Sequence, residues 1–363
     1  MKTIVFLALQ LSQPRCIKRI ESVRQAGFPI KVYGFDNGLY NASLRNLPFK
    51  VDKIIERKKE DSKWKKILLF IRTIKEVKRD NPSDSILYFF SSELGTIAYL
   101  LGYRNYIYEE GDINASKVSS SVLRRILLSI ERQVVKKSKL TVFTSEGFTD
   151  FVFGKDAPDN IVILPNKLSN FFREELKNNL RGKEPNFSNI KFGFIGLIRY
   201  PNTIIRFAKV IGKHFPHHEF HFFGDVRRSH FIDEELKSYK NIFFHGPFIN
   251  PDDLEVIYSK VDINIVCYDT DYDNVRIAEP NKLYESIFFE TPIVVSKDTY
   301  LERRVDTLGV GFSICASNDE SIINFVNGID RENWNNIIQS MKSIPVKDVI
   351  DNPSELISRM KDL

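Results

Sequence analysis

Cysteine is scarce in this sequence, and the residues that occur are far apart. Cys16, Cys267 and Cys315 show no paired spacing within the 363 residues, so neither a disulfide framework nor a zinc site is supported. A reducing compartment is the natural setting for such a chain.

Long apolar runs are also missing. No segment approaches the roughly 18 consecutive apolar residues that a membrane span requires. The run from Ile4 to Leu11 follows only Lys2, and no small-residue cleavage site comes after it, so a first buried strand is favoured over a signal peptide. Low-complexity stretches and short-period repeats are absent. We therefore expect a folded cytoplasmic protein.

Positive charge is concentrated in the first half of the chain. Residues 1–168 carry 29 Lys and Arg against 18 Asp and Glu, whereas the remaining residues carry 24 against 29. A basic surface can serve nucleic acid, but no recognition motif or aromatic-basic platform accompanies it, so no nucleic-acid partner is expected.

The length of the chain suits two domains of roughly 150 to 180 residues each. Strand-like and helix-like segments alternate in both halves, which predicts parallel sheets covered by helices. The expected boundaries are an N-terminal domain over 1–168 and a C-terminal domain over 169–345. A helical segment over 346–363 could pack back on the first domain.

The segment from Glu279 to Ser296 combines polar residues at a predicted helix start with a short buried strand. Asn281 and Lys282 lie where free backbone N–H groups and a lysine could meet an anion, and Glu285 follows one turn later. The β-branched run 293–295 is typical of a parallel strand buried on both faces. A nucleotide diphosphate fits this order of elements.

An ordered set of motifs over 190–296 resembles the donor-binding domain of GT-B glycosyltransferases, most closely family 4 and its relatives in bacterial surface polysaccharide synthesis. The motifs are Gly196-Leu-Ile-Arg199, Phe222-Phe223-Gly224, Ile242-Phe-Phe-His245-Gly246, Asp253 to Tyr258, Val261-Asp262-Ile263 and Pro280-Asn281-Lys282-Leu283-Tyr284-Glu285. The resemblance implies an α/β fold of the GT-B type, with two Rossmann-like domains whose parallel sheets face a central cleft.

The resemblance also implies roles for particular residues. Glu285 would hold the ribose hydroxyls, as a carboxylate can accept both in a bidentate arrangement. A second glutamate is common eight positions earlier in the family, but Ile277 stands there, so Glu279 is a weaker candidate for the donor sugar. The other donor-binding candidates are Gly196, Arg199 and Lys282 at the diphosphate, Asn281 and Leu283 in the same motif, and Phe244, His245 and Gly246 near the nucleobase.

The carboxylates after the strand at 106–108 are candidates for a catalytic base. In relatives that invert the anomeric centre, such a group deprotonates the acceptor, whereas retaining enzymes need no base. Asp112 is the first candidate and Glu110 the second, and a solvated loop turned by Gly111 is an equal alternative. Ser145, after the next strand, could line the same cleft or cap the following helix.

Two short patterns suggest a metal. Asp269-Thr270-Asp271 matches the Asp-x-Asp signature of the other large glycosyltransferase fold, but an acidic loop is the favoured interpretation this late in the chain. On the strand expected around His218 and His221, neighbouring histidines face opposite ways. We expect no metal.

A basic amphipathic helix surrounds Trp64. Its apolar stripe would be either a core face, which we favour, or a surface that docks onto anionic lipid. The stripe comprises Trp64, Ile67, Leu68, Ile71 and Ile74, and the basic residues around it include Arg57, Lys58, Lys59, Lys63, Lys65, Lys66, Arg72, Lys75, Lys78 and Arg79.

Together these features predict a metal-independent, hexosyltransferase-like enzyme without a cofactor. It would move a sugar from a UDP- or GDP-linked donor to a glycan or polyprenyl-linked acceptor in capsule, O-antigen or exopolysaccharide synthesis, as a peripheral protein at the inner face of the cell membrane. The alternatives are a nucleotide-sugar epimerase of the same fold and a non-catalytic scaffold or binding protein.

Overall fold

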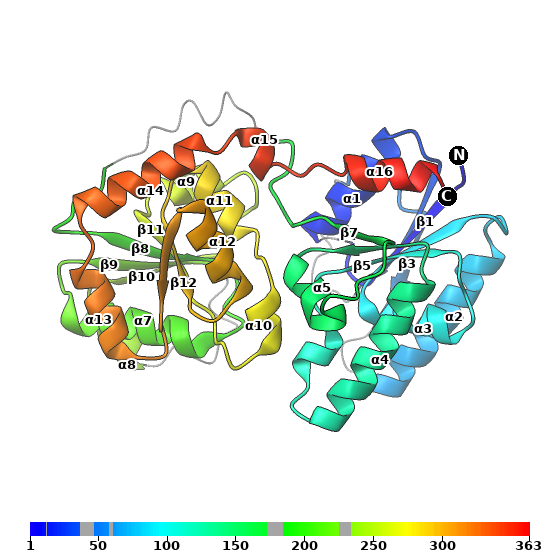
Figure 1. The fold of residues 1–363 in the computed structure, drawn as a ribbon, viewed down its shortest axis with the longest axis horizontal. Coiled ribbons are helices and arrows are strands. Elements are labelled where there is room, and N and C mark those ends of the chain that lie inside the picture. The colour runs from blue at the N-terminus through cyan, green and yellow to red at the C-terminus, as the bar shows by residue number, and fades with distance from the viewer. Residues whose placement is uncertain (12, 37–46, 58–60, 173–183, 225–233) are drawn as a thin grey trace. The chain divides into compact units, whose positions relative to one another are not determined.

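The computed structural model describes residues 1–11, 13–36, 47–57, 61–172, 184–224 and 234–363. The chain forms two compact units (Figure 1). Unit 1 comprises Met1–Asn166 together with Asn352–Leu363, and unit 2 comprises Lys167–Asp351. The segment 346–363 is therefore divided, because its first residues belong to unit 2 and its last ones to unit 1.

Unit 1 is built on a parallel sheet with the strand order β3-β2-β1-β4-β5-β6-β7. Every residue of β1, β4, β5 and β6 is buried, as expected for a sheet that helices cover on both faces. The strands are Ile4–Ala8 (β1), Ile30–Asp36 (β2), Lys53–Glu56 (β3), Ile86–Phe90 (β4), Tyr106–Glu110 (β5), Leu140–Phe143 (β6) and Ile161–Ile163 (β7).

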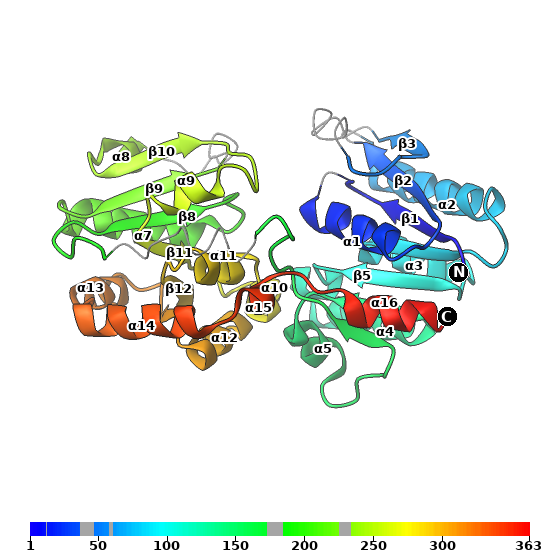
Figure 2. The same cartoon turned by 90° about the horizontal axis from the view of Figure 1, so that it is seen from above.

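The helices of unit 1 lie on the two faces of this sheet. They are Pro14–Gln25 (α1), Lys63–Arg79 (α2), Ser92–Leu100 (α3), Ser121–Lys137 (α4), Glu146–Phe153 (α5) and Ser354–Lys361 (α16). One face is covered by α1 and α16, the other by α2, α3 and α4 (Figures 1 and 2). Leu356 and Met360 of α16 belong to the same hydrophobic core as Ile20 and Val23 of α1, so the end of the chain completes the core of unit 1.

Unit 2 repeats this plan with the strand order β10-β9-β8-β11-β12-β13. Its strands are Lys191–Ile195 (β8), Glu219–Phe223 (β9), Ile242–Gly246 (β10), Ile263–Val266 (β11), Ile293–Ser296 (β12) and Gly311–Ile314 (β13). Its helices are Pro201–His214 (α7), Glu234–Ser238 (α8), Leu254–Tyr258 (α9), Asp273–Ile277 (α10), Lys282–Phe288 (α11), Tyr300–Leu308 (α12), Asp319–Asn327 (α13), Arg331–Ser343 (α14) and Val346–Val349 (α15).

Each sheet has a point at which the strand order reverses. In unit 1 it lies between β1 and β4, and in unit 2 between β8 and β11. In open parallel sheets, ligands bind outside the carboxyl ends of the strands at such a point. The connections after β8 and β11 are therefore the first place to look for a site in unit 2.

The two segments that connect the units are paired with each other within unit 2. The backbone N–H of Leu168 donates to Val349 at 3.0 Å, and that of Asp351 donates to Leu168 at 2.8 Å. A parallel bridge joins Leu168 to Ile350. The outgoing and returning segments are thus held side by side.

The core-face interpretation of the stripe on α2 is wrong for its first half. Trp64 is 76% exposed and Leu68 64%, whereas Phe70, Ile74 and Val77 are buried. The buried stripe follows the i, i+4, i+7 spacing from Phe70, so Trp64 and Leu68 lie on the neighbouring stripe. Lys58 and Lys59, before this helix, lie outside the described residues. No helix in the described part of the chain has the length and hydropathy to span a membrane.

Candidate donor site and a carboxylate cluster

Three glycines stand at the carboxyl ends of neighbouring strands in unit 2. Gly196 follows β8, Gly224 follows β9 and Gly246 ends β10, with φ of 142°, 139° and 80°. The N–H of Gly224 donates to the carbonyl of Gly246 at 2.8 Å, and a Cβ added to Gly224 would overlap the carbonyl oxygen of Gly196. Only glycine adopts this backbone without strain. These three neighbouring strands therefore end in residues that place no side chain at this edge of the sheet.

Lys282 lies against this row of glycines. It is the first residue of α11, and its Cε would stand 3.8 Å from a Cβ added to Gly196. Its Nζ lies 2.6 Å from Oε2 of Glu285, and both side chains are buried. The structure therefore brings together Gly196, Lys282 and Glu285, which the sequence placed in one site.

Glu285 is fully buried and accepts hydrogen bonds at both carboxylate oxygens. Oε1 accepts from Nδ2 of Asn281 at 2.6 Å, and Oε2 accepts from the hydroxyl of Tyr258 at 2.9 Å as well as from Lys282. Burial, followed by the charge of Glu285, raises the pKa of Tyr258 far above its ordinary value, so this hydroxyl stays a donor. Glu285 is not a solvated helix residue, and Asn281 contacts it directly.

Two other residues of this motif have different surroundings. Glu279 accepts a short hydrogen bond from Tyr284 and lies 3.4 Å from Nε of Arg304. The side chain of Leu283 is fully buried in the hydrophobic core, and its N–H donates to Pro280. Leu283 therefore supports α11 by packing, and its side chain presents no group to a ligand.

The connection after β8 carries an exposed arginine and a capped helix. Arg199 is exposed, and its charge opposes the rise that burial causes in the pKa of Tyr268. Asp269 accepts from the N–H of Thr203 at 2.8 Å and from its hydroxyl at 2.7 Å, so it caps the first turn of α7. This structural use accounts for the first carboxylate of Asp269-Thr270-Asp271. No group of three potential metal ligands occurs among the described residues.

The residues expected near the nucleobase point to opposite faces of β10. Phe244 stacks on Phe222 with ring centroids 5.2 Å apart, on the face that packs against the core. His245 is exposed and stacks on Phe223 at 4.2 Å with an interplanar angle of 6°. Phe244 is therefore half-buried, whereas His245 is exposed.

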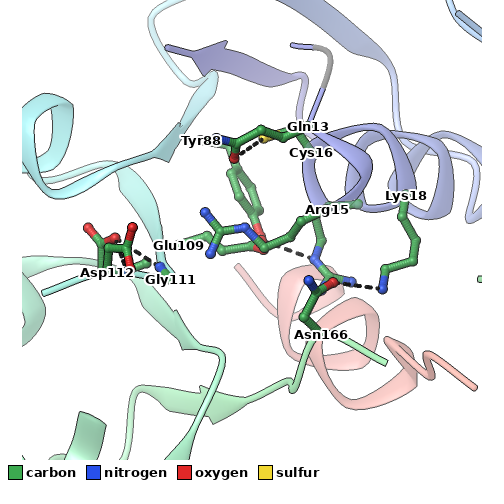
Figure 3. Close-up of polar contacts among 11 residues, drawn as sticks. Gln13, Arg15, Cys16, Lys18, Tyr88, Glu109, Gly111, Asp112 and Asn166 are labelled. Atoms are coloured by element: carbon green, nitrogen blue, oxygen red, sulfur yellow. Dashed lines mark hydrogen bonds and ion pairs between the residues drawn. The ribbon is translucent and has the colours of Figure 1, made fainter. Parts of the chain in front are cut away.

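The carboxylates at the end of β5 in unit 1 differ in their surroundings. Glu109 is fully buried, pairs with Nε of Arg19 at 3.0 Å and accepts a short hydrogen bond from Tyr88. Arg15 approaches the same carboxylate, with Nε 3.8 Å from Oε1 (Figure 3). Glu109 therefore balances the buried Arg19 and the half-buried Arg15, and holds α1 against the sheet.

Glu110 is buried and accepts hydrogen bonds from the turn that follows it. Its Oε1 accepts from the N–H groups of Gly111 and Asp112 at 2.8 and 2.7 Å. Burial raises its pKa to about 7, although Arg15 opposes the shift. The side chain of Asp112 is 45% exposed and lies 3.9 Å from Lys117, so it is the more accessible of the two base candidates.

A third buried carboxylate, Glu131 of α4, is joined to Glu110 through a tyrosine. The hydroxyl of Tyr108 lies 2.9 Å from Oε2 of Glu110 and 2.6 Å from Oε1 of Glu131. One hydroxyl proton cannot serve two carboxylates, so one of the glutamates holds a proton. Burial and the charge of Glu110 raise the pKa of Glu131 to about 8, which makes it the protonated partner.

Glu131 and Tyr258 are the site residues that sequence reasoning missed. Glu131 precedes the buried Val134 and Val135 by one helical turn, so the period of α4 could have indicated a carboxylate on its buried face. Tyr258 ends α9, and its contact with Glu285 depends on the packing of two helices that lie far apart in sequence.

No protein-family model and no curated protein sequence matches the chain. Solved structures resemble it over its whole length. HepE from Anabaena, in complex with UDP and glucose, has a TM-score of 0.71 at 14% identity, covering 100% of this chain and 98% of its own. Sucrose-phosphate synthase from Thermosynechococcus elongatus has a TM-score of 0.69 at 12% identity, with 100% and 98% covered. A glycosyltransferase from Rickettsia africae has 0.65 at 14% identity, with 99% and 96% covered. The fold is that of the GT-B glycosyltransferases, as the sequence predicts.

Proposed function

We propose that this protein is a glycosyltransferase that moves a hexose from a UDP- or GDP-linked donor to a glycan or polyprenyl-linked acceptor. One observation carries the proposal: a row of three glycines at the carboxyl edge of unit 2 ends beside a buried Lys282–Glu285 pair, in a fold shared with proteins solved with UDP. The reaction would be independent of metal and would serve bacterial surface polysaccharide synthesis, as in the family 4 enzymes that the sequence resembles.

The donor would lie along the carboxyl edge of unit 2. Lys282 and the exposed Arg199 are the cations that would meet the diphosphate, whose negative charge grows as it leaves. When phosphate takes the ammonium of Lys282, Oε2 of Glu285 loses one donor and can accept a ribose hydroxyl instead. Glu285 would therefore exchange its hydrogen bond with Lys282 for one with the ribose of the ligand.

The transfer itself exchanges one bond for another at the sugar. The acceptor oxygen bonds to the anomeric carbon, and the bond from that carbon to the diphosphate oxygen breaks. In a reaction with inversion, the hydroxyl proton passes to Asp112, the most accessible carboxylate of the cluster at the end of β5. In a reaction with retention, no protein base is required.

Calorimetry with UDP and GDP, combined with release of nucleoside diphosphate from a panel of sugar nucleotides, tests the donor site. Glu285→Gln keeps the size of the side chain and removes its charge, so nucleotide affinity should fall about 10- to 100-fold. Glu255→Gln, at an exposed position of α9, is the matched control and should bind as the wild type does. Unchanged affinity in Glu285→Gln would remove Glu285 from the site.

The same assay separates the alternatives. Release of nucleoside diphosphate together with a glycosylated acceptor supports transfer. Appearance of an epimeric sugar and free nucleotide without transfer would indicate an epimerase of this fold. Nucleotide binding without any turnover, over a broad donor and acceptor panel, would indicate a binding protein. This alternative is tested because Ile277 stands where the family commonly has a glutamate.

We further propose that unit 1 docks onto anionic lipid at the inner face of the cell membrane. Exposed apolar side chains occupy the N-terminal turns of both α2 and α4, namely Trp64, Ile67, Leu68, Val122, Leu123 and Ile126. Both helices lead into strands of the parallel sheet, so these turns lie at the carboxyl edge, where β5 ends near Asp112. Exposed basic residues, among them Lys65 and Arg125, flank the apolar groups, and each adds about 1 kcal/mol near an anionic surface.

Trp64 provides a direct probe of this docking. Its fluorescence should shift to the blue with anionic phosphatidylglycerol vesicles, whereas Trp334 is buried in unit 2 and should not respond. Charge reversal at Lys65 and Lys66 should reduce co-sedimentation with these vesicles. Reversal of the exposed Lys213 and Lys347 in unit 2 is the control. Equal binding to neutral phosphatidylcholine and anionic vesicles would contradict the proposal.

A further inference from the structure

A chain of three hydrogen-bonded side chains crosses β9 and β10 in unit 2. Nε2 of His221 lies 2.9 Å from Oε2 of Glu219, and Nδ1 of His221 lies 2.9 Å from Nε2 of His245. His221 is 8% exposed, whereas His245 is exposed at the carboxyl end of β10. The chain therefore leads from a buried imidazole to the surface beside Gly246.

These contacts fix which nitrogen of each ring carries a proton. The carboxylate of Glu219 only accepts, so Nε2 of His221 carries the hydrogen, and in a neutral ring Nδ1 must then accept. His245 consequently donates from Nε2, which leaves its own Nδ1 as a lone-pair acceptor. Among the described residues, Nδ1 of His245 has no hydrogen-bond partner.

Both imidazoles are neutral near pH 7. Burial, opposed by Glu219, lowers the pKa of His221 below its ordinary value of 6.5. Burial and the neighbouring His221 lower that of His245, and Lys260 acts in the same direction on both rings. Lys191 of β8 also lowers the pKa of His221. Burial and the two lysines therefore preserve the acceptor at Nδ1, against the opposing charge of Glu219.

The position of His245 places this acceptor beside the proposed donor site. Gly196, Gly224 and Gly246 end three adjacent strands, and Lys282 stands at the Gly196 end of this row. Two strand spacings, about 10 Å, separate β8 from β10. A ligand whose phosphates meet Lys282 and whose body lies over the glycines would reach the flat, solvent-facing ring of His245.

We propose that Nδ1 of His245 accepts a hydrogen bond from a ring N–H of the donor nucleobase, N3–H of uracil or N1–H of guanine, and that Glu219 and His221 hold it in that state. The inference rests on the proposed function, because it assigns the base of the same nucleotide. Glu219 and His221 act as positioning residues, since neither needs to touch the ligand.

The same chain predicts how acid changes the site. A proton from solvent binds Nδ1 of His245, and the proton on its Nε2 passes to Nδ1 of His221, which becomes an imidazolium between Glu219 and His245. The outward atom is then an N–H donor facing another N–H donor. Affinity for the base should therefore fall as the pH drops below the lowered pKa of the pair.

Methylated nucleotides test the contact on the full chain. Calorimetry at about pH 7.5 compares UDP with 3-methyluridine diphosphate, and GDP with 1-methylguanosine diphosphate, since methylation replaces the ring N–H with a methyl group and leaves the rest of the nucleotide unchanged. The wild type should prefer the unmethylated form of its nucleotide by about tenfold, the worth of one hydrogen bond. His245→Phe keeps the stack on Phe223 and should abolish the preference.

The positioning role has its own readout. Glu219 fixes the hydrogen on Nε2 of His221, so Glu219→Ala should release the tautomers of both rings and weaken the methylation preference at about pH 7.5. Glu219 also raises the pKa of His221, so the same substitution should move the acid loss of nucleotide affinity to lower pH. In nitrogen-15 spectra of the ligand-free protein, Nδ1 of His245 should be unprotonated and Nε2 protonated.

The outcomes separate the two proposals. Nucleotide binding without a methylation preference, an unchanged preference in His245→Phe, or a proton on Nδ1 of His245 would each overturn this inference and leave the proposed function standing. If neither UDP nor GDP binds to the wild type, the proposed function is overturned together with it. An unshifted acid profile in Glu219→Ala would remove the positioning role.

Discussion

Replacing Glu131 with glutamine should make unit 1 more stable at alkaline pH. Its carboxyl group in the folded chain has a pKa of about 8 against an ordinary 4.5. A group whose folded pKa is raised stabilises the fold below its unfolded pKa and loses that contribution as the pH rises to the folded pKa. With about 1.4 kcal/mol per pH unit, the wild type should lose about 3 kcal/mol between about pH 5.5 and pH 8 through this group alone.

Glutamine reproduces the protonated form of Glu131, because its amide N–H can donate to the hydroxyl of Tyr108 as the carboxylic acid does. Urea unfolding at about pH 5.5 and pH 8.5 measures the effect by circular dichroism. Trp334 fluorescence identifies the transition of unit 2, so that of unit 1 can be assigned. Glu56→Gln, which removes an exposed carboxylate of unit 1, is the control.

The decisive quantity is the change in the free energy of unfolding between the two pH values. Any loss of stability caused by packing the glutamine amide is the same at both pH values and cancels in this difference. The variant should lose about 3 kcal/mol less than the wild type over this interval, and the control should follow the wild type. Parallel losses in Glu131→Gln and the wild type would refute the assignment of the shared proton to Glu131.

Three further predictions follow from backbone geometry and from the base assignment. Glu290 has φ 50° directly after the C-cap of α11, a backbone conformation that is strained for any residue except glycine. In thermal unfolding, Glu290→Gly should therefore be about 1 kcal/mol more stable than Glu290→Ala. Equal stabilities would contradict the strain at this position. Gly224→Ala should largely prevent folding of unit 2, because the added Cβ would overlap the carbonyl oxygen of Gly196. Gly246→Ala, whose Cβ would meet no atom within 4 Å, should lower the free energy of unfolding by only about 1 kcal/mol in urea. Similar losses of stability in the two variants would argue against the close approach of Gly224 to Gly196. Asp112→Asn should lower turnover at least 100-fold with unchanged nucleotide affinity, and full activity would favour retention of configuration.

The sequence predicted those helices and strands that have a strong local pattern of capping residues or buried positions. The helix expected over 121–137 has those bounds, because Ser120 caps its first turn and Val134 and Val135 repeat its buried face. The β-branched run 293–295 forms the buried strand β12. Ser145 accepts from the N–H of Gly147, so the capping interpretation of that serine is confirmed.

Elements without such a pattern were missed or misplaced. The edge strand Lys53–Glu56 is largely exposed, so its sequence shows neither a buried run nor alternation. The helix expected from Pro251 to Ser259 begins at Leu254, where the first buried residue of that segment lies. The sequence does not separate the exposed Trp64 from the core residues of α2, because the buried stripe and the neighbouring exposed stripe are both apolar. Only the packing of the folded chain distinguishes them.

The residues of the candidate site also fall into those that the sequence could bring together and those that it could not. A contiguous motif brought Asn281, Lys282 and Glu285 together, since residues one helical turn apart are neighbours. The contacts of Glu285 with Tyr258 and of Tyr108 with Glu131 join segments more than 20 residues apart. Nothing in local spacing marks such pairs, so they became visible only in the folded chain.

The position of α16 affects the order in which the protein can fold during synthesis. The strands of unit 1 leave the ribosome before unit 2, yet Leu356 and Met360 of its core follow every residue of unit 2 in the chain. Unit 2 is contiguous and can close as soon as Asp351 has emerged. Of the two units, unit 1 therefore begins to be translated earlier but is completed later, and until then its sheet exposes the apolar surface that α16 later covers.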